Sequence, residues 1–331
     1  MKLTVHGDCS SARRERLDEL IAWWQGDDSH MEVSTSGSTG TPKLIAIERE
    51  AIVASIHATH DALSSHASGH HARMLIALPL DTIGGIMAVF RALTWGWDID
   101  LLPASRTLKW EGSASMISLV PQQALALSPE MWSRVEIVLL GGGPLSQSGR
   151  SQLQPFADQI WEGFGMTETL SHIALKRLNE SCYHPVSGVN ISTQADGALV
   201  IHAPHLGLDQ LVTQDVVEVE DGCFKWLGRK DLVINSAGKK IHPEVVESAM
   251  EQAGSPRGMM TWVEHPDWGQ AAVWLMAASA PADVGAYDKA LATLPSWQRP
   301  KACYHVELPL TANGKLNRAA AQRLAQELAL A

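Results

Sequence analysis

Residues 34–43 read STSGSTGTPK and contain the residue types that bind phosphate. Glycine lets backbone N–H groups turn toward an anion, and hydroxyl side chains add further donors. The kinase-type phosphate loop is excluded, because Gly37 and Gly40 are three positions apart and Lys43 is followed by Leu44. A flexible linker has a similar composition, so this stretch by itself is compatible with either a linker or a nucleotide-binding loop.

Four more segments combine glycine, hydroxyl and charged residues in short stretches. One of them carries a single acid, Asp215, which is expected between two strands, and the last places a lysine in a polar glycine turn near the C-terminus. The segments are EGFGMTET at 162–169, VTQDVVEV at 212–219, WLGRKDLVINSAGKKIHPEVVE at 226–247 and PLTANGKLNR at 309–318. Each segment alone is weak evidence, and the order of all five along the chain is the informative feature.

In this order the five segments resemble the adenylate-forming superfamily: acyl-CoA synthetases, the adenylation domains of peptide synthetases and firefly luciferase. The resemblance covers residues 34–318. It implies a reaction in which a carboxylate attacks the α-phosphorus of ATP, pyrophosphate leaves, and a thiol then attacks the acyl-AMP. With 33 residues ahead of the first segment, and with TSGSTGTPK, GMTETLSHIALKRL and NSAGKKIHPEVVE, the chain is most similar to the short o-succinylbenzoate–CoA ligases of bacterial menaquinone synthesis.

The resemblance implies which residues bind ATP and Mg²⁺. Thr167 would contact the α-phosphate, and Glu168 would hold Mg²⁺, which prefers carboxylate and phosphate oxygens. Lys315 would reach from the lid to the reacting carboxylate, so Lys315, Thr167 and Glu168 are the expected catalytic residues. The expected ATP-binding residues are Thr35, Ser36, Gly37, Ser38, Thr39, Gly40, Lys43, Gly141, Gly142, Gly143, Thr167, Asp215 and Arg229. Without the other motifs, the simpler interpretation of Glu168 would be a surface acid at the start of a helix, and that of Lys315 a solvated lysine.

For the second half-reaction the resemblance implies a lid that rotates about Asp231 and binds CoA as the second substrate. The expected CoA tunnel is Ala237, Gly238 and Lys239, and the expected acyl pocket is Gly84, Gly85, Ser171 and His172. The chain departs from the family at PLDTIGG, where many members have a histidine after PL, and this departure leaves the acid in doubt. Lys176 and Arg177 are candidates for a second substrate carboxylate, although a solvated helix face is the simpler interpretation.

The elements that must position these residues follow from hydrophobic periodicity. Short apolar runs that end in Pro or Gly predict strands, and helical segments such as 12–26, 51–63, 84–96 and 146–157 separate them. This alternation predicts a mainly parallel sheet covered on both faces, with ligands at the carboxyl ends of its strands. After about residue 185, alternating segments around Asp-Gly turns predict hairpins.

We therefore predict an α/β fold with two domains. Residues 1–230 form the large N-terminal domain, with a parallel sheet plus a β-rich section, and residues 231–331 form a small α+β lid. The chain has 331 residues, 45% of them hydrophobic, which is enough for two packed cores.

Charge and cysteine content exclude several classes of protein. The net charge is −10 with scattered lysines and arginines, which argues against binding to nucleic acid or to an acidic membrane. No apolar run approaches the ~20 residues of a membrane helix. The four cysteines lie far apart without a CxxC pair, so neither a disulfide nor a zinc site is expected, and a cytoplasmic location follows. The sequence leaves a homodimer open.

The sequence thus predicts an AMP-forming acid–thiol ligase that uses ATP, Mg²⁺ and CoA, with o-succinylbenzoate as the expected acid. Two alternatives within the enzymes stay open: a ligase for another aryl or acyl acid, and transfer to a carrier-protein thiol. A non-catalytic adenylate-binding protein is disfavoured because Lys315, Glu168 and Thr167 are all present.

Overall fold

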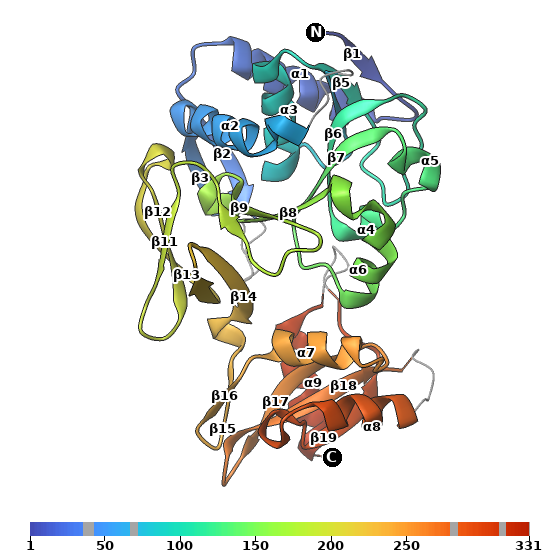
Figure 1. The fold of residues 1–331 in the computed structure, drawn as a ribbon, viewed down its shortest axis with the longest axis vertical. Coiled ribbons are helices and arrows are strands. Elements are labelled where there is room, and N and C mark those ends of the chain that lie inside the picture. The colour runs from blue at the N-terminus through green and yellow to red at the C-terminus, as the bar shows by residue number, and fades with distance from the viewer. Residues whose placement is uncertain (36–42, 67–71, 279–283, 311–315, 331) are drawn as a thin grey trace.

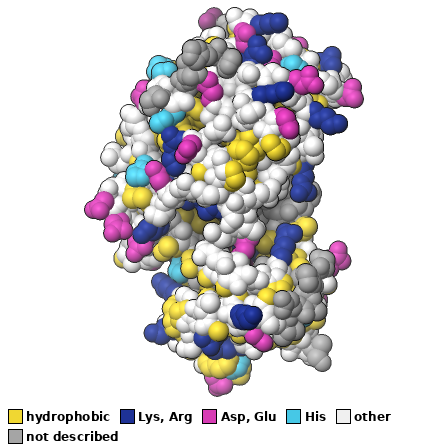
Figure 2. Space-filling view, turned by 45° about the vertical axis from the view of Figure 1, so that its right-hand side comes forward, with side chains coloured by type: hydrophobic (Ala, Val, Ile, Leu, Met, Phe, Trp, Pro, Cys, Tyr) yellow, Lys and Arg dark blue, Asp and Glu magenta, His cyan; other side chains and the backbone are white. Residues whose placement is uncertain are grey.

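The computed structural model describes residues 1–35, 43–66, 72–278, 284–310 and 316–330. Figure 1 shows an upper part that contains the N-terminal residues and a smaller lower part that contains the C-terminal ones. None of the helices among the described residues combines the length and apolar character needed to span a lipid bilayer. In Figure 2, Lys and Arg side chains lie scattered among Asp and Glu on the face in view.

An eight-stranded sheet forms the centre of the upper part. Its strand order is β1-β5-β4-β6-β7-β8-β9-β10; neighbours from β1 to β8 pair in parallel, and β9 and β10 continue the sheet antiparallel. The strands are β1 Leu3–Val5, β4 Arg73–Ile76, β5 Asp98–Leu101, β6 Ala114–Leu119, β7 Val135–Leu140, β8 Ile160–Gly165, β9 His172–Arg177 and β10 His184–Pro185. The predicted mainly parallel sheet is therefore confirmed.

Helices cover both faces of this sheet, and each face has its own apolar cluster. Alternation along β6 shows the two faces, because Met116 belongs to one cluster and Ile117 to the other. α1 Ser11–Gln25, α2 Arg49–Leu63 and α3 Ile83–Trp95 cover the first face, and α4 Pro121–Ala124, α5 Pro129–Trp132 and α6 Gln147–Leu153 cover the second. The predicted helix at 146–157 ends at Leu153 and continues as 3₁₀ turns.

Two antiparallel units flank the main sheet. The hairpin of β2 His30–Thr35 and β3 Lys43–Glu48 brackets residues 36–42. The second unit is a meander of β11 Asn190–Thr193, β12 Ala198–Ala203, β13 Leu208–Glu220 and β14 Cys223–Arg229. These hairpins were predicted, but Asp215 lies within one continuous strand, β13, and not between two strands.

A five-stranded sheet forms the lower part, with apolar clusters of its own. Its strands are β15 Ile234–Ser236, β16 Lys239–Ile241, β17 Gly258–His265, β18 Gly269–Ala277 and β19 Ala302–Val306, and its helices are α7 Pro243–Gln252, α8 Val284–Thr293 and α9 Arg318–Leu330. The remaining short 3₁₀ turns are η1 Ser64–His66, η2 Gln154–Gln159, η3 Thr167–Thr169, η4 Pro204–Leu206, η5 Lys230–Leu232 and η6 Ser296–Gln298. The boundary between residues 230 and 231 stays a prediction.

Helix α7 makes contacts between the two parts. The Glu251 carboxylate accepts hydrogen bonds from the backbone N–H groups of Gln147 and Ser148, at 3.1 and 3.3 Å, and from the Ser148 hydroxyl at 2.7 Å. These donors lie in the first turn of α6, where unpaired N–H groups and the helix dipole favour an anion. In the first turn of α7, Glu244 packs so close to Gly228 that a Cβ on Gly228 would lie 2.6 Å from the Glu244 Oε2 atom.

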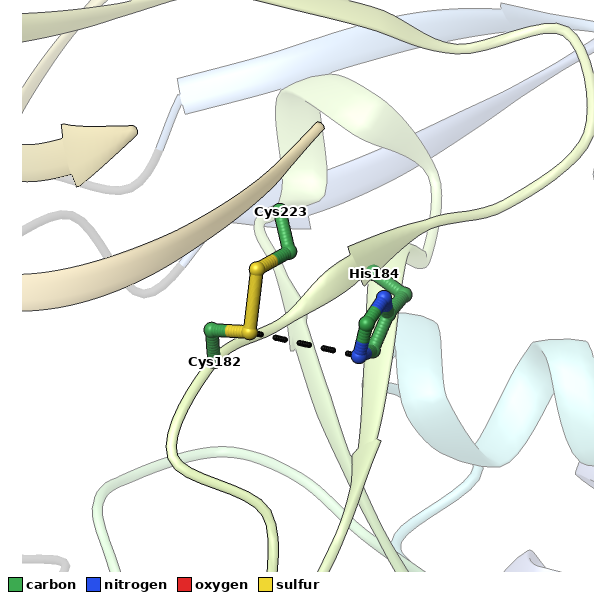
Figure 3. A group of neighbouring side chains, drawn as sticks. All are labelled: Cys182, His184 and Cys223. Atoms are coloured by element: carbon green, nitrogen blue, oxygen red, sulfur yellow. Dashed lines mark hydrogen bonds between the residues drawn. A yellow bond between two sulfur atoms is a disulfide. The ribbon is translucent and has the colours of Figure 1, made fainter. Parts of the chain in front are cut away.

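Two further predictions are wrong. Cys182 and Cys223, which are 41 residues apart, form a disulfide with a Cα–Cα distance of 5.8 Å, because strand pairing brings them together (Figure 3). Lys176 and Arg177 lie on strand β9 and not on a solvated helix face. Lys176 is buried 3.8 Å from Glu162 and lies over the Tyr183 ring, whereas Arg177 covers Trp161.

Candidate active site

The predicted adenine-binding glycines lie at the carboxyl ends of parallel strands. Gly141 follows β7 directly, and β8, the next strand of the sheet, ends at Gly165. A Cβ placed on Gly141 or Gly143 would meet no atom of the described residues within 4 Å. Gly142 adopts a φ of 81°, which favours glycine. The loop therefore leaves an open surface at the sheet edge, beside which a planar group could lie.

The predicted magnesium motif forms a rigid turn after β8. A Cβ on Gly165 would lie 2.0 Å from the Ser171 carbonyl oxygen, so the turn closes only with glycine. The Thr169 hydroxyl accepts from the Met166 N–H at 3.0 Å and donates to the Ser171 carbonyl at 2.8 Å. Buried Leu170 adopts a φ of 66° between them. These constraints fix the backbone that carries Thr167 and Glu168.

Glu168 is exposed on this turn and Thr167 is half-buried. No salt bridge to Glu168 occurs within the part of the chain that the structure describes. An exposed carboxylate without a cationic partner, at the carboxyl edge of the sheet, fits the ligand chemistry of Mg²⁺, which binds one or two carboxylates plus phosphate oxygens.

The predicted ribose-binding pair lies on facing strands. Asp215 on β13 is directly opposite Arg229 on β14. Trp226 donates its indole N–H to the Asp215 Oδ1 atom at 2.8 Å. Burial raises the pKa of the Asp215 carboxyl, while the Trp226 hydrogen bond and the Arg229 charge oppose that shift. Arg229, however, donates two hydrogen bonds to the predicted hinge residue Asp231, at 3.0 and 3.1 Å.

Ser171 and His172 of the predicted acyl pocket meet a buried arginine. Arg91, on α3, donates from Nη2 to the Ser171 hydroxyl at 2.6 Å. The His172 Nδ1 atom lies 3.3 Å from the same hydroxyl, and its Nε2 atom lies 3.1 Å from the Thr59 hydroxyl on α2. The three elements α2, α3 and β9 thus converge on one polar cluster, Thr59–His172–Ser171–Arg91, inside an apolar core.

Arg91 has no anionic partner in this cluster. The residue is 2% exposed, its Nε atom is buried without a hydrogen-bond partner, and no carboxylate of the described residues lies within 4.0 Å of its guanidinium. Burial lowers its pKa to about 10, so it remains a cation at neutral pH. Burial, followed by the Arg91 charge, holds the pKa of His172 well below its usual range. Burying a charge without a counter-charge is costly, so the placement of Arg91 in this core requires an explanation.

Sequence reasoning missed Arg91. Its only signal is a charged residue in the apolar run GGIMAVFRALTW, which a snorkelling surface arginine would also produce. The two glycines of that run have a packing role in the structure. A Cβ on Gly85 would lie 2.1 Å from the Pro79 carbonyl oxygen, and one on Gly84 would lie 3.1 Å from the Leu78 Cδ1 atom. Gly85 is therefore required for close packing of the first turn of α3.

Other predicted site residues do not lie at the carboxyl edge of the main sheet. Ala237 and Gly238 form the two-residue turn of the β15–β16 hairpin, with φ values of 48° and 76°. Figure 1 shows this hairpin, which also carries Lys239, at the lower end of the molecule and away from β7 and β8. Asp231 lies in η5, between the two parts.

Several predicted residues lie outside the described residues. They are Ser36, Gly37, Ser38, Thr39, Gly40 and Lys315. The backbones of Thr35 and Lys43 pair at the loop end of the β2–β3 hairpin, and a bridge between Leu310 and Leu316 brackets the segment that contains Lys315.

The model of the AMP-binding enzyme family matches residues 7–196, more than half of the chain. A probable 2-succinylbenzoate–CoA ligase from Mycobacterium tuberculosis is 26% identical over 251 residues, covering 68% of this chain and 64% of that protein. The chain therefore spans less than two thirds of the length of that relative. A 2-succinylbenzoate–CoA ligase from Bacillus licheniformis is 26% identical over 341 residues, covering 88% of this chain and 69% of the relative.

The fold is similar to two solved structures of o-succinylbenzoate coenzyme A synthetase from Bacillus subtilis. The complex with the acyl-adenylate intermediate OSB-AMP has a TM-score of 0.75 at 22% identity, and the match covers 88% of this chain and 68% of that one. The complex with ATP and a magnesium ion has a TM-score of 0.73 at 22% identity, and the match covers 87% and 68%. At this identity the likeness shows the fold, and it agrees with the predicted α/β architecture.

Proposed function

We propose that this chain, which belongs to the AMP-binding enzyme family, is an ATP-dependent ligase that joins o-succinylbenzoate to CoA through an acyl-AMP intermediate. The observation that supports this acid most directly is Arg91. o-Succinylbenzoate carries two carboxylates, and only one of them can react at a time. The other remains an anion, and the buried Arg91 guanidinium offers the charge that would hold it. The names of the curated relatives point to the same acid.

In this proposal the carboxyl edge of the main sheet binds the nucleotide. The Gly141–Gly143 loop lies beside adenine, and Asp215 accepts hydrogen bonds from the ribose hydroxyls. Thr167 donates to the α-phosphate, and residues 35–43 supply N–H and hydroxyl donors to the outer phosphates. Mg²⁺ held by Glu168 would screen the phosphate charge. Catalysis is then mostly positioning and charge stabilisation, as in other phosphoryl chemistry.

The acyl end of the substrate would lie against α3 and β9. Ser171 orients the Arg91 guanidinium through its 2.6 Å hydrogen bond, and neutral His172 orients Ser171. Since His172 stays uncharged at neutral pH, it adds no second positive charge next to Arg91. The cluster therefore offers a single preorganised cation, which is the arrangement needed to hold one carboxylate.

The reaction type can be tested directly. With ATP, Mg²⁺ and o-succinylbenzoate, the protein should release pyrophosphate, and addition of CoA should give AMP and a thioester. The measurement is chromatographic separation of nucleotide products and of CoA esters. Formation of ADP and phosphate would contradict adenylation, whereas AMP formation without the thioester would favour a carrier-protein thiol as the acceptor.

If the lid rotates about Asp231, a substitution that stiffens the backbone there should affect the two half-reactions unequally. Asp231→Pro fixes φ at about −65° at the proposed hinge, so adenylation should survive while thioester formation falls more than tenfold, about 1.4 kcal/mol of barrier or more. Asp231→Ala is the matched control, because it also removes the ion pair with Arg229 but leaves the backbone free. The two half-reactions are measured separately, as pyrophosphate exchange and as CoA acylation from supplied acyl-AMP. Equal losses in both would argue against a hinge.

The alternatives make different predictions. A ligase for another aryl or acyl acid should prefer an acid other than o-succinylbenzoate in a panel of carboxylates. A non-catalytic adenylate-binding protein should bind ATP or acyl-AMP without releasing pyrophosphate. We also propose a cytoplasmic location, where ATP and CoA are available.

A further inference from the structure

Strand pairing brings together three side chains of types that bind metals, none of which is assigned to the proposed active site. Tyr183 and Phe224 exchange two backbone hydrogen bonds, of 2.7 and 3.0 Å, in an antiparallel bridge. In this register His184 lies opposite Cys223, and Cys182 lies two residues before His184 on the same face. The ligand atoms of Cys182, His184 and Cys223 all lie within 4.8 Å of one another. Figure 3 shows the disulfide between the two cysteines and the His184 imidazole beside the Cys182 sulfur.

The distances suit one tetrahedral cation. The Cys182 sulfur lies 3.9 Å from the His184 Nε2 atom. A Zn–S bond and a Zn–N bond together span about 4.3 Å, so a single Zn²⁺ can bind both atoms. In the structure the two sulfurs are joined as a disulfide, and no metal can bind them in that state. Reduction would free both sulfurs, and rotation of the two side chains would then separate them enough to act as independent ligands.

A backbone bridge joins these two segments in addition to the disulfide. The Tyr183–Phe224 bridge lies beside it and joins the segment before β10, at the edge of the eight-stranded sheet, to β14, at the edge of the meander. His184 is exposed and Cys182 is half-buried, so solvent and ions reach the group. The backbone bridge therefore holds the Cα atoms of the three residues near one another independently of the S–S bond.

We propose that the reduced form of the Cys182–Cys223 pair, together with His184, is a binding site for Zn²⁺ or a similar soft divalent cation. A phosphine reductant supplies two electrons, water supplies two protons and the oxygen of the phosphine oxide, and the disulfide becomes two thiols. Metal binding then displaces both thiol protons, so two thiolates and one neutral imidazole hold the cation, with a fourth position open to water. The cation replaces the disulfide as the cross-link between the two sheets.

The test uses Co²⁺ as a spectroscopic substitute for Zn²⁺ on the full-length protein, reduced with a phosphine and kept free of oxygen. We expect one Co²⁺ per chain, with thiolate-to-cobalt charge-transfer absorption and the visible bands of a tetrahedral site, and displacement by Zn²⁺. The unreduced protein should show none of this absorption. Cys182→Ser and Cys223→Ser should abolish it, and His184→Ala should weaken Co²⁺ binding at least tenfold.

The matched control is the double variant Cys9→Ala/Cys303→Ala, which removes the two free cysteines and should keep the full signal. Thermal melting of each variant shows whether it is folded. The proposal is wrong if the reduced wild-type protein takes up no stoichiometric Co²⁺ at micromolar concentration. It is equally wrong if uptake persists in a folded Cys182→Ser/Cys223→Ser double variant.

Discussion

Replacing Arg91 with methionine should lower kcat/KM for o-succinylbenzoate at least a hundredfold without lowering thermal stability. Truncating one partner of a buried charge pair between protein and ligand costs about 2–5 kcal/mol, and a hundredfold corresponds to about 2.7 kcal/mol. The melting temperature should stay the same or rise. The substitution removes a desolvated cation that has no carboxylate beside it among the described residues. Steady-state kinetics and thermal melting measure the two effects.

The control for this substitution is Arg91→Lys, which keeps the charge but loses the planar pair of donors. It should recover part of the activity. A purely structural arginine predicts a different outcome: Arg91→Met would then lower the melting temperature and reduce activity toward all acids equally. Ser171→Ala should have a smaller effect than Arg91→Met, because it removes a hydrogen bond that orients the guanidinium and leaves the charge in place.

Lys315→Ala should lower the rate of adenylation by at least about a hundredfold with little change in ATP affinity. The proposed role of Lys315 is to meet charge that develops as carboxylate and α-phosphate join, so its interaction is stronger in the transition state than in bound ATP. Removing one preorganised donor typically costs ~10²–10³ in rate. Pyrophosphate exchange gives the rate, and equilibrium binding gives the affinity.

Thioester formation from chemically prepared acyl-AMP should survive in Lys315→Ala, because in the proposed mechanism the lid has by then carried this lysine away. Lys289→Ala, on the exposed side of α8 in the same part of the chain, is the matched control and should be active in both half-reactions. A Lys315→Ala protein that is inactive from both starting points would mean that the lysine is structural or that the lid does not alternate. A near-normal rate of adenylation in Lys315→Ala would show that Lys315 does not take part in the adenylation step.

Much of the fold could be predicted because its signals are local. Short apolar runs closed by Pro or Gly predicted β4 to β7, and alternation around Asp-Gly turns predicted the meander. The segment around Lys176 was misjudged, because a short apolar run with two basic residues fits both a helix and a buried strand. Only the pairing of β9 with β8 decides that it is a strand.

The features that sequence reasoning missed depend on long-range packing. Nothing near Arg91 in the sequence shows that Ser171 and His172, 80 or more residues away, will be its neighbours. Cys182 and Cys223 look unrelated until the Tyr183–Phe224 bridge sets their register. The predicted roles of Thr167, Glu168, Asp215 and Lys315 rest on the family resemblance and stay predictions.

The most direct test of the account compares o-succinylbenzoate with two analogues, each lacking one of its carboxylates, in wild-type protein and in Arg91→Met. The measurement is the rate of acid-dependent pyrophosphate release. We predict that the wild type prefers the diacid to the reactive monoacid at least a hundredfold, and that Arg91→Met removes most of this preference. A wild-type protein that reacts equally well with the diacid and a monoacid, or a preference that survives in Arg91→Met, would contradict the account.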